Sequence, residues 1–252
     1  MSIKLATWNI GSLYVNFEEN VHYIEDVVSR HPQDILCMQE FPEGDSITEQ
    51  VMRWGNFEVM EYVATSESHI HKGSKMGVAI FSKRPIRRVD TIQLPLPNVE
   101  ISHNGIREYW HTKYFSANIC AVEDGELLLI TGHGFPFHRY RLENQEGYCH
   151  IHPPFAVLDD WIKHLCDTYT GMRICMAADF NITAPLSFMP YSQEHFFDVF
   201  NEKATRPSGR KTDAIILPIG CQLLNEENFS LKNSNNIPVF DHNFIAAEFD
   251  CD

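Results

Sequence analysis

The sequence lacks the segments that mark membrane-spanning and secreted proteins. No apolar run approaches the length that a transmembrane helix needs. The stretch from Met1 to Trp8 enters a strand-like pattern directly, without the basic and then apolar residues of a secretion signal. The seven cysteines include no Cys-x-x-Cys pair and show no regular spacing, which disfavours a disulfide framework and a thiolate zinc site. We therefore expect free cysteines and a cytoplasmic protein.

Positive charge is also scarce. The chain has 20 Lys and Arg against 34 Asp and Glu, which gives a formal net charge of −14. Such a body repels long polyanions, because phosphate neutralisation by basic side chains supplies most non-specific affinity for nucleic acid. The composition favours a short or small phosphorylated substrate, or a local basic patch. Three basic clusters are present, and we interpret each on its own as a solvated face: Lys83, Arg84, Arg87 and Arg88; Arg139 and Arg141; Lys203, Arg206, Arg210 and Lys211.

What is present is a chain of 252 residues with 44% hydrophobic content, which suits one domain over residues 1–252. Helical spacing of apolar residues predicts helices over 18–30, over 46–54 after a capping box of Ser46 and Glu49, and from 155 after Pro153 and Pro154. Strand-like runs cover 3–10, 35–38, 57–64, 76–82, 86–94, 111–122, 126–131, 173–178, 213–217 and 243–249. Polar loops at 66–75, 95–107 and 205–211 are long enough to shape a binding site. The pattern predicts a sheet-rich α/β protein, and it leaves open whether one doubly wound sheet or two stacked sheets form.

Polar side chains sit at the ends of five strand-like runs. These clusters are Thr7-Trp8-Asn9, Gln39-Glu40, Gly132-His133, Asp179-Phe180-Asn181 and Asp241-His242. A carboxylate beside a buried strand is costly unless it is paired or bound to a metal. Any one of these residues is equally well explained as a cap or a surface ion pair, but all five together are not. If the strand ends converge, they predict a site for a hard divalent cation with oxygen ligands, and not for zinc.

Six motifs in order resemble those of the endonuclease/exonuclease/phosphatase superfamily. They are Thr7-Trp8-Asn9-Ile10, Gln39-Glu40, Gly77-Val78-Ala79-Ile80-Phe81-Ser82, Ala178-Asp179-Phe180-Asn181, Thr212-Asp213-Ala214-Ile215-Ile216 and Asp241-His242-Asn243. The resemblance extends from residue 4 to 249. It implies an α/β (α+β) four-layer sandwich, in which two packed, mostly antiparallel sheets are flanked by helices and the site lies at one end.

The segments Arg107-Glu108 and His133-Gly134-Phe135-Pro136 are similar to the deoxyribonuclease-I-like branch of that superfamily. The branch implies two carboxylate–imidazole pairs, Glu108 with His133 and Asp213 with His242. It also implies Mg²⁺, with Mn²⁺ as a substitute, held by Glu40 with Asn9 and Asp241. In that reading Asp179 or His242 activates the attacking water, Asn181 holds a phosphate oxygen, and His133 is a general acid.

Four positions depart from the usual pattern of the repair endonucleases of the superfamily. Gly11 stands where an Asp is usual, His133 where a Tyr is usual, Ala178 replaces Gly and Phe240 replaces Ser. None of these removes an expected ligand. The leading hypothesis is a metal-dependent phosphodiesterase or nuclease acting on nucleic acid or nucleotide-like substrates, with no obligate protein partner. The alternatives are a phosphatase or diesterase of an inositol phosphate or lipid headgroup, and a non-catalytic binding domain.

Overall fold

The computed structural model describes residues 2–11, 17–64, 70–71, 74–142 and 148–251. Most of the loop expected at 66–75 therefore lies outside the described residues. In the described part, no helix is both long and apolar enough to cross a membrane.

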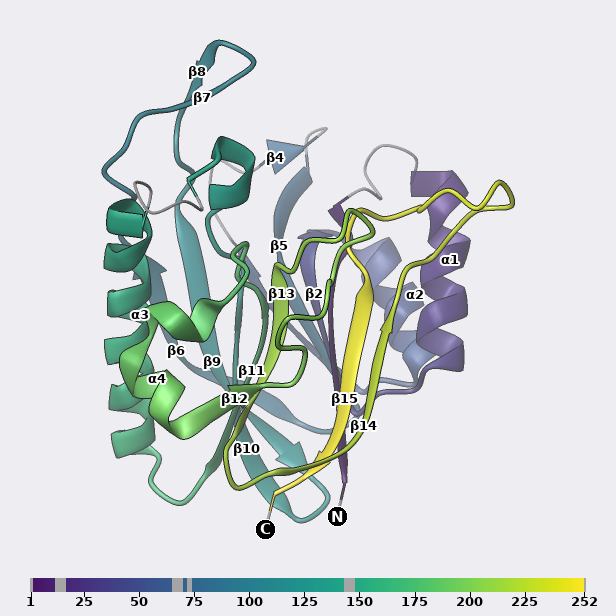
Figure 1. Cartoon of the computed structure of the whole chain (residues 1–252). Coiled ribbons are helices and arrows are strands. Elements are labelled where there is room, and N and C mark those ends of the chain that lie inside the picture. Colours follow the sequence, from purple (N-terminus) through teal and green to yellow (C-terminus); the bar gives the residue numbers. More distant parts are fainter. Residues whose placement is uncertain (1, 12–16, 65–69, 72–73, 143–147, 252) are drawn as a thin grey trace.

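Two sheets stand side by side at the centre of the molecule (Figure 1). The first has the strand order β14-β15-β1-β2-β5-β3, with β4 paired to β5, and the second has the order β12-β13-β11-β10-β9-β6. Of the described pairs, β1–β2 and β10–β11 are parallel and the others antiparallel. The strands of the first sheet are β1 (Ile3–Asn9), β2 (Ile35–Pro42), β3 (Val59–Ala64), β4 (Ile70–His71), β5 (Ser74–Ser82), β14 (Gln222–Phe229) and β15 (Phe244–Asp250). Those of the second are β6 (Ile86–Leu94), β9 (Lys113–Val122), β10 (Gly125–Gly132), β11 (Arg173–Asp179), β12 (Phe196–Asp198) and β13 (Asp213–Pro218).

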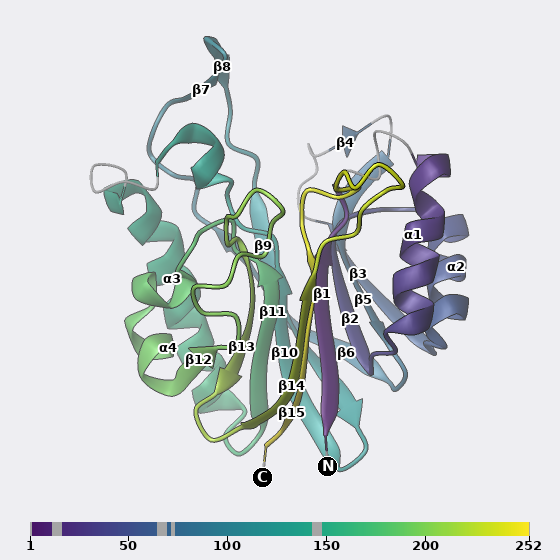
Figure 2. The ribbon, with the colours of Figure 1, turned by 45° about the vertical axis from the view of Figure 1, so that its right-hand side comes forward.

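Helices cover the outer face of each sheet (Figure 2). The helices α1 (Phe17–Arg30) and α2 (Asp45–Gly55) lie on the first sheet, and α3 (Tyr148–Thr168) and α4 (Pro190–His195) lie on the second. Three buried apolar clusters separate these layers: one under α1 and α2, one between the sheets, and one under α3. This arrangement confirms the four-layer sandwich and decides between the two architectures that the sequence left open. Short 3₁₀ helices, η2 (Phe137–Tyr140) and η3 (Pro185–Phe188), and a small hairpin of β7 (Ile101–His103) and β8 (Ile106–Glu108) complete the described elements.

Two helix starts differ from the predictions. The capping box is wrong, because α2 begins at Asp45 after Gly44, without a side-chain cap among the described residues. Ser46 lies inside the helix, where the Gln50 side chain donates to its hydroxyl over 3.3 Å. Helix α3 starts at Tyr148 and not after the two prolines, so Pro153 and Pro154 lie within its first two turns.

The expectation that the cysteines are free is wrong for one pair. Cys221 and Cys251 form a disulfide, with their Cα atoms 4.2 Å apart. Cys221 precedes β14 and Cys251 follows β15, and these two strands are hydrogen-bonded neighbours, so the bond closes the end of this pair. Cys37, Cys120 and Cys175 are free and buried between the sheets, where they pack as small apolar side chains, as expected.

Candidate active site

A cavity of about 830 Å³ opens at one end of the sandwich. Of the nine residues predicted from the sequence, eight line it: Asn9, Glu40, Glu108, His133, Asp179, Asn181, Asp241 and His242. The ninth, Asp213, is buried and contacts His242 from behind. The convergence follows from topology. Strands β1, β10 and β11 end at this edge and β13 and β15 begin there, so the polar residues at those strand ends meet.

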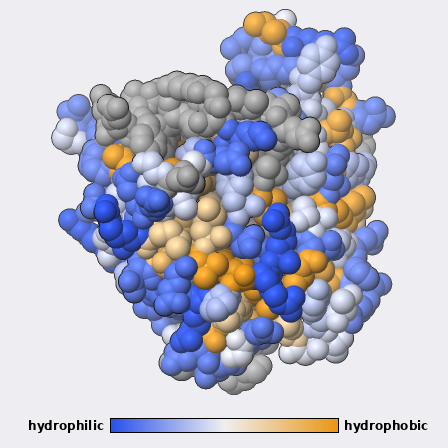
Figure 3. All heavy atoms as spheres, turned by 180° about the vertical axis from the view of Figure 1, so that it is seen from behind, coloured by the Kyte–Doolittle hydropathy of each residue, from blue (hydrophilic) through white to orange (hydrophobic). Residues whose placement is uncertain are grey.

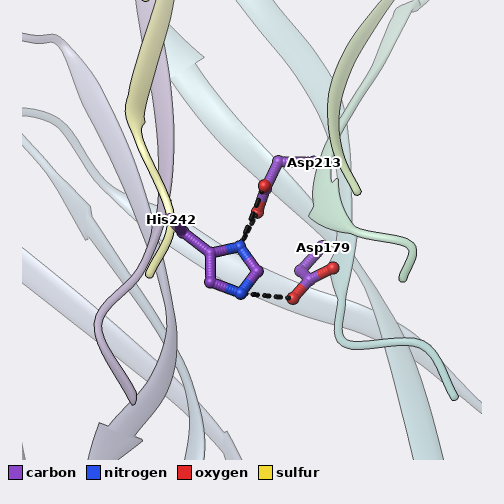
Figure 4. Close-up of side chains that lie close together, drawn as sticks. All are labelled: Asp179, Asp213 and His242. Atoms are coloured by element: carbon purple, nitrogen blue, oxygen red, sulfur yellow. Dashed lines mark hydrogen bonds and ion pairs between the residues drawn. The ribbon is translucent and has the colours of Figure 1, made fainter. Parts of the chain in front are cut away.

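An aspartate–histidine–aspartate arrangement forms the innermost part of the site (Figure 4). His242 Nδ1 lies 2.9 and 3.0 Å from the two carboxylate oxygens of Asp213, and His242 Nε2 lies 3.7 Å from Asp179 Oδ2. The hydroxyls of Thr205 and Thr212 donate to Asp213 Oδ2 over 2.8 and 3.0 Å, so that carboxylate accepts and His242 Nδ1 carries the proton. The Nε2 atom is therefore left to act in the cavity. One ligand atom from each of these three residues lies within 4.8 Å of the others, close enough for the group to hold a metal ion.

The electrostatics of this group are set by burial and by its own charges. Burial lowers the pKa of His242, but the carboxylates of Asp213 and Asp179 outweigh that effect and raise it to about 9. Burial raises the pKa of Asp179, and the neighbouring charge of Asp213 adds to this, against the opposing effect of His242. At neutral pH the three residues therefore hold more protons, and less net negative charge, than the same groups would hold in water.

Two asparagines fix the orientation of Asp179. Asn9 Nδ2 donates to Asp179 Oδ2 over 2.9 Å, and the backbone N–H of Asn181 donates to Oδ1 over 2.8 Å. Asn181 has a positive φ of 56°, an uncommon conformation for a residue with a side chain, and its amide donates to the carbonyl of Gly134 over 3.2 Å. A backbone conformation of this kind in a residue with a side chain is typical of functional sites.

Glu40 reaches the cavity because the strand that carries it is irregular. It occupies a β-bulge in β2, between Gln39 and Phe41, with a φ of 52°. A bulge re-aims a side chain that regular pleating would direct elsewhere. A Cβ atom on Gly11 would overlap the Glu40 carboxylate, so the glycine makes room for it. This explains the absence of an aspartate at position 11, since a side chain there would displace Glu40.

His133 lies between carboxylates, but Glu108 is not one of them. His133 Nε2 is 3.7 Å from Glu40 Oε1 and 3.6 Å from Asp179 Oδ2. Glu108 instead contacts Arg139 over 3.0 Å and accepts a hydrogen bond from the Tyr140 hydroxyl. The expected Glu108–His133 pair does not form, because Glu108 lies at the end of the β7–β8 hairpin and its carboxylate contacts Arg139 and Tyr140 instead. This hairpin projects from the body of the molecule and has apolar atoms at its tip (Figure 3). Glu108 ties that hairpin to η2 at the rim of the cavity.

Several basic and aromatic residues that the sequence did not single out as site residues also line the cavity. Lys113 is only 4% exposed; burial lowers its pKa, against the opposing effects of Glu40 and Asp179. Arg206 donates to the backbone oxygen of Asp241 over 3.0 Å and pairs with the Asp241 carboxylate. In the sequence, Arg206 stood out only as part of a basic cluster. Of that cluster, Arg206 and Arg210 line the cavity. Lys203 pairs with Glu226 and Lys211 pairs with Asp198.

The fold is shared with solved structures of low sequence identity. An endonuclease/exonuclease/phosphatase family protein from Bacteroides thetaiotaomicron matches with a TM-score of 0.70 and 14% identity, over 100% of this chain and 96% of its own. The catalytic domain of human Nocturnin with bound sulfate matches with a TM-score of 0.69 and 14% identity, over 99% and 93%. A mannosyl-6-phosphatase from Bacteroides thetaiotaomicron VPI-5482 matches with a TM-score of 0.67 and 14% identity, over 98% and 99%. At these identities the likeness is one of fold.

The sequence itself matches a family model. The model of the Endonuclease/Exonuclease/phosphatase family aligns with residues 6–198, which include the second half of β1 and all strands from β2 to β12. None of the curated proteins compared matches the chain. With its fold and its convergent carboxylates and histidines, this chain belongs to the Endonuclease/Exonuclease/phosphatase family of metal-dependent phosphoester hydrolases.

Proposed function

We propose that the protein is a Mg²⁺-dependent phosphodiesterase acting on short nucleic acids or nucleotide-like substrates. The observation that carries this proposal is the charge of the cavity lining. The lining contains five basic and four acidic residues. The basic ones are Lys113, Arg139, Arg141, Arg206 and Arg210, and the acidic ones are Glu40, Glu108, Asp179 and Asp241. Over the whole chain acids outnumber bases by 34 to 20, so the cavity is locally enriched in positive charge, as an anionic substrate requires.

The donor set fits a hard divalent cation. Glu40 and Asp241 offer carboxylate oxygens and Asn9 an amide oxygen, and these ligand types suit Mg²⁺, or Mn²⁺ in its place. We propose these three residues as the ligands. Bound there, the ion would withdraw charge from the phosphoryl oxygens and stabilise the leaving oxygen.

The protein's own side chains would position and protonate the substrate. Asp179, held by Asn9 and Asn181, presents a carboxylate that can accept a proton from an attacking water. His242, held by Asp213, directs Nε2–H toward a phosphoryl oxygen. Asn181 offers a neutral donor to a second phosphoryl oxygen. Because His133 lies between Glu40 and Asp179, it is placed to give a proton to the leaving group.

The aromatic rim favours a nucleotide-like substrate over a plain phosphomonoester. Tyr109, Trp110 and Tyr140 line the cavity beside Arg139, and Tyr109 is 74% exposed. Aromatic rings next to cations are the usual surface on which unpaired bases stack. The second candidate is a small phosphorylated molecule, because the net charge of −14 repels long polyanions more strongly than small anions. The fold that the chain shares with a mannosyl-6-phosphatase agrees with this candidate.

Turnover of bis-p-nitrophenyl phosphate and of p-nitrophenyl phosphate, each with Mg²⁺, Mn²⁺ or EDTA, tests the proposal. We expect cleavage of the diester with either metal and none with EDTA, with Glu40→Ala as the blank. His242→Gln should lose about 10²–10⁴-fold in kcat, the usual size of one proton-transfer group. His22→Gln, an exposed histidine on α1, is the matched control and should keep full activity. Preference for the monoester would favour the second candidate, and no turnover with any metal would reject both.

A further inference from the structure

The loop before β13 carries two arginines on one tight turn. The backbone N–H of Arg206 donates to the carbonyl of Arg210 over 2.9 Å, and the N–H of Gly209 donates to the carbonyl of Arg206 over 3.0 Å. Gly209 has a φ of 85°, which a residue with a side chain rarely adopts. These bonds hold the two ends of the turn together. Both side chains line the same cavity, on the side of Asp241.

The two guanidinium groups differ in their partners. Arg206 is 13% exposed at its side chain, pairs with Asp241, and donates to His138 Nε2 over 3.1 Å. An arginine can only donate, so His138 accepts at Nε2 and is neutral. Arg210 has no hydrogen-bond or ion-pair partner for its side chain among the described residues, yet its charge acts on His138 together with that of Arg206. One arginine is therefore fixed, and the second presents an uncompensated charge to the cavity.

Of the two arginines, Arg210 is distinct from the cation at the centre of the site. Lys113 faces Glu40 and Asp179, where the reacting phosphate is proposed to lie. Arg206 and Arg210 lie on the turn before β13 and both act on His138, and the charge of Arg206 acts on Asp179 as well. A single phosphodiester carries one negative charge, which Lys113 and a divalent cation already oppose. Unlike Arg206, Arg210 is not paired with a carboxylate among the described residues, so its charge is available to a second anionic group.

We infer that Arg206 and Arg210 form a subsite for a second phosphoryl group of the substrate, beside the bond that is cleaved. The inference rests on the proposed function and narrows it to substrates that carry two phosphoryl groups. A planar guanidinium suits a phosphate, to which it donates two parallel hydrogen bonds. Arg210 is the group that recognises this phosphate, and Arg206, which also holds Asp241, fixes the turn.

Kinetics on two chromogenic esters test the subsite. One is thymidine 5′-p-nitrophenyl phosphate, and the other is the same ester with a 3′-phosphate. We expect a KM about tenfold lower for the ester with the 3′-phosphate, because a tenfold change in affinity corresponds to the free energy of one charge-assisted hydrogen-bond pair. Arg210→Gln should remove that difference in KM between the two esters. Arg87→Gln, an exposed arginine of β6 outside the cavity, is the matched control. An unchanged KM ratio in Arg210→Gln overturns the inference.

Titration calorimetry separates this outcome from a failure of the proposed function. If neither ester is cleaved, the phosphodiesterase proposal fails, but binding still reports on the subsite. Thymidine 3′,5′-bisphosphate should bind the wild type about tenfold more tightly than Arg210→Gln. Glucose 1,6-bisphosphate, which carries two phosphoryl groups on a sugar without a base, shows whether the second phosphate alone suffices. Equal affinity of wild type and Arg210→Gln for both bisphosphates rejects the subsite.

Discussion

At the scale of single residues, Gly11 decides where the carboxylate of Glu40 can lie. A Cβ atom at this position would overlap the carboxylate of Glu40, which is the flexible end of its side chain. We expect Gly11→Ala to fold normally, because Glu40 and not the backbone gives way, and to lose about 10²-fold in activity from the misplaced carboxylate. Gly220→Ala is the matched control, since no heavy atom beyond its chain neighbours lies within 4 Å of its Cβ. Equal kcat values for the two variants would contradict this account of Gly11.

His138 should couple stability to acid pH. Burial, and then the charges of Arg206 and Arg210 with that of His242, lower its pKa from 6.5 to about 4, against the hydrogen bond to the carbonyl of Asn181. The unfolded chain binds this proton more readily, so the contribution of His138 to the free energy of unfolding is lost as the pH falls from about 6.5 to about 4.

Urea denaturation at several pH values in this window tests the effect of His138. His138→Gln keeps an acceptor for Arg206 but cannot titrate. We expect the free energy of unfolding of this variant to fall less steeply with acidification than that of the wild type. Parallel curves would show that His138 is not responsible.

The sequence located most of the candidate site at this scale, but not the contacts between its parts. The polar residues at strand ends were identifiable because carboxylates beside buried runs need a partner. The partner of Glu108 was not, because it depends on how a hairpin packs on η2. The positions of Arg206 and Arg210 depend on a turn whose direction no periodicity encodes.

At the scale of elements, most strands of the two sheets were predictable, whereas the edge strands β12 and β14 were not. Strands such as β2 and β11 are almost wholly buried and read as continuous apolar runs. Strand β14 (Gln222–Phe229) is mostly polar and partly exposed, and it lies at the edge of its sheet, so neither alternation nor an apolar run identifies it. The hairpin of β7 and β8 was likewise expected only as a loop.

The disulfide between Cys221 and Cys251 should stabilise the sheet edge formed by β14 and β15. Cys221 and Cys251 are separated by 30 residues, and closing a loop of this length stabilises a fold by about 3.6 kcal/mol through the entropy of the unfolded chain. We expect a reducing agent to lower the free energy of unfolding by that amount in urea titrations. Cys251→Ser should show the lower stability from the outset and no response to the reductant. A reductant effect of the same size in Cys251→Ser would point to another cause.

At the scale of the whole molecule, the buried cluster between the sheets predicts a single cooperative domain over residues 1–252. This cluster is built by both sheets, so neither sheet has a complete core without the other. Trp8 packs in the cluster beneath α1 and α2, and Trp161 in the cluster beneath α3. In variants whose single tryptophan is Trp8 or Trp161, the urea midpoint by fluorescence should equal the same variant's midpoint by circular dichroism. Two separate midpoints within one variant would reject the single domain.

The direction of the strands has a practical consequence for handling the protein. Strand β1 starts at Ile3, paired with Phe249 near the other end of the chain, and finishes at Asn9 in the cavity. Both termini therefore emerge from the base of the sandwich, at the end remote from the cavity (Figure 1). An affinity tag, a fluorophore or a surface linker attached at either terminus would leave the cavity mouth open, so immobilised protein is suited to screening substrate libraries.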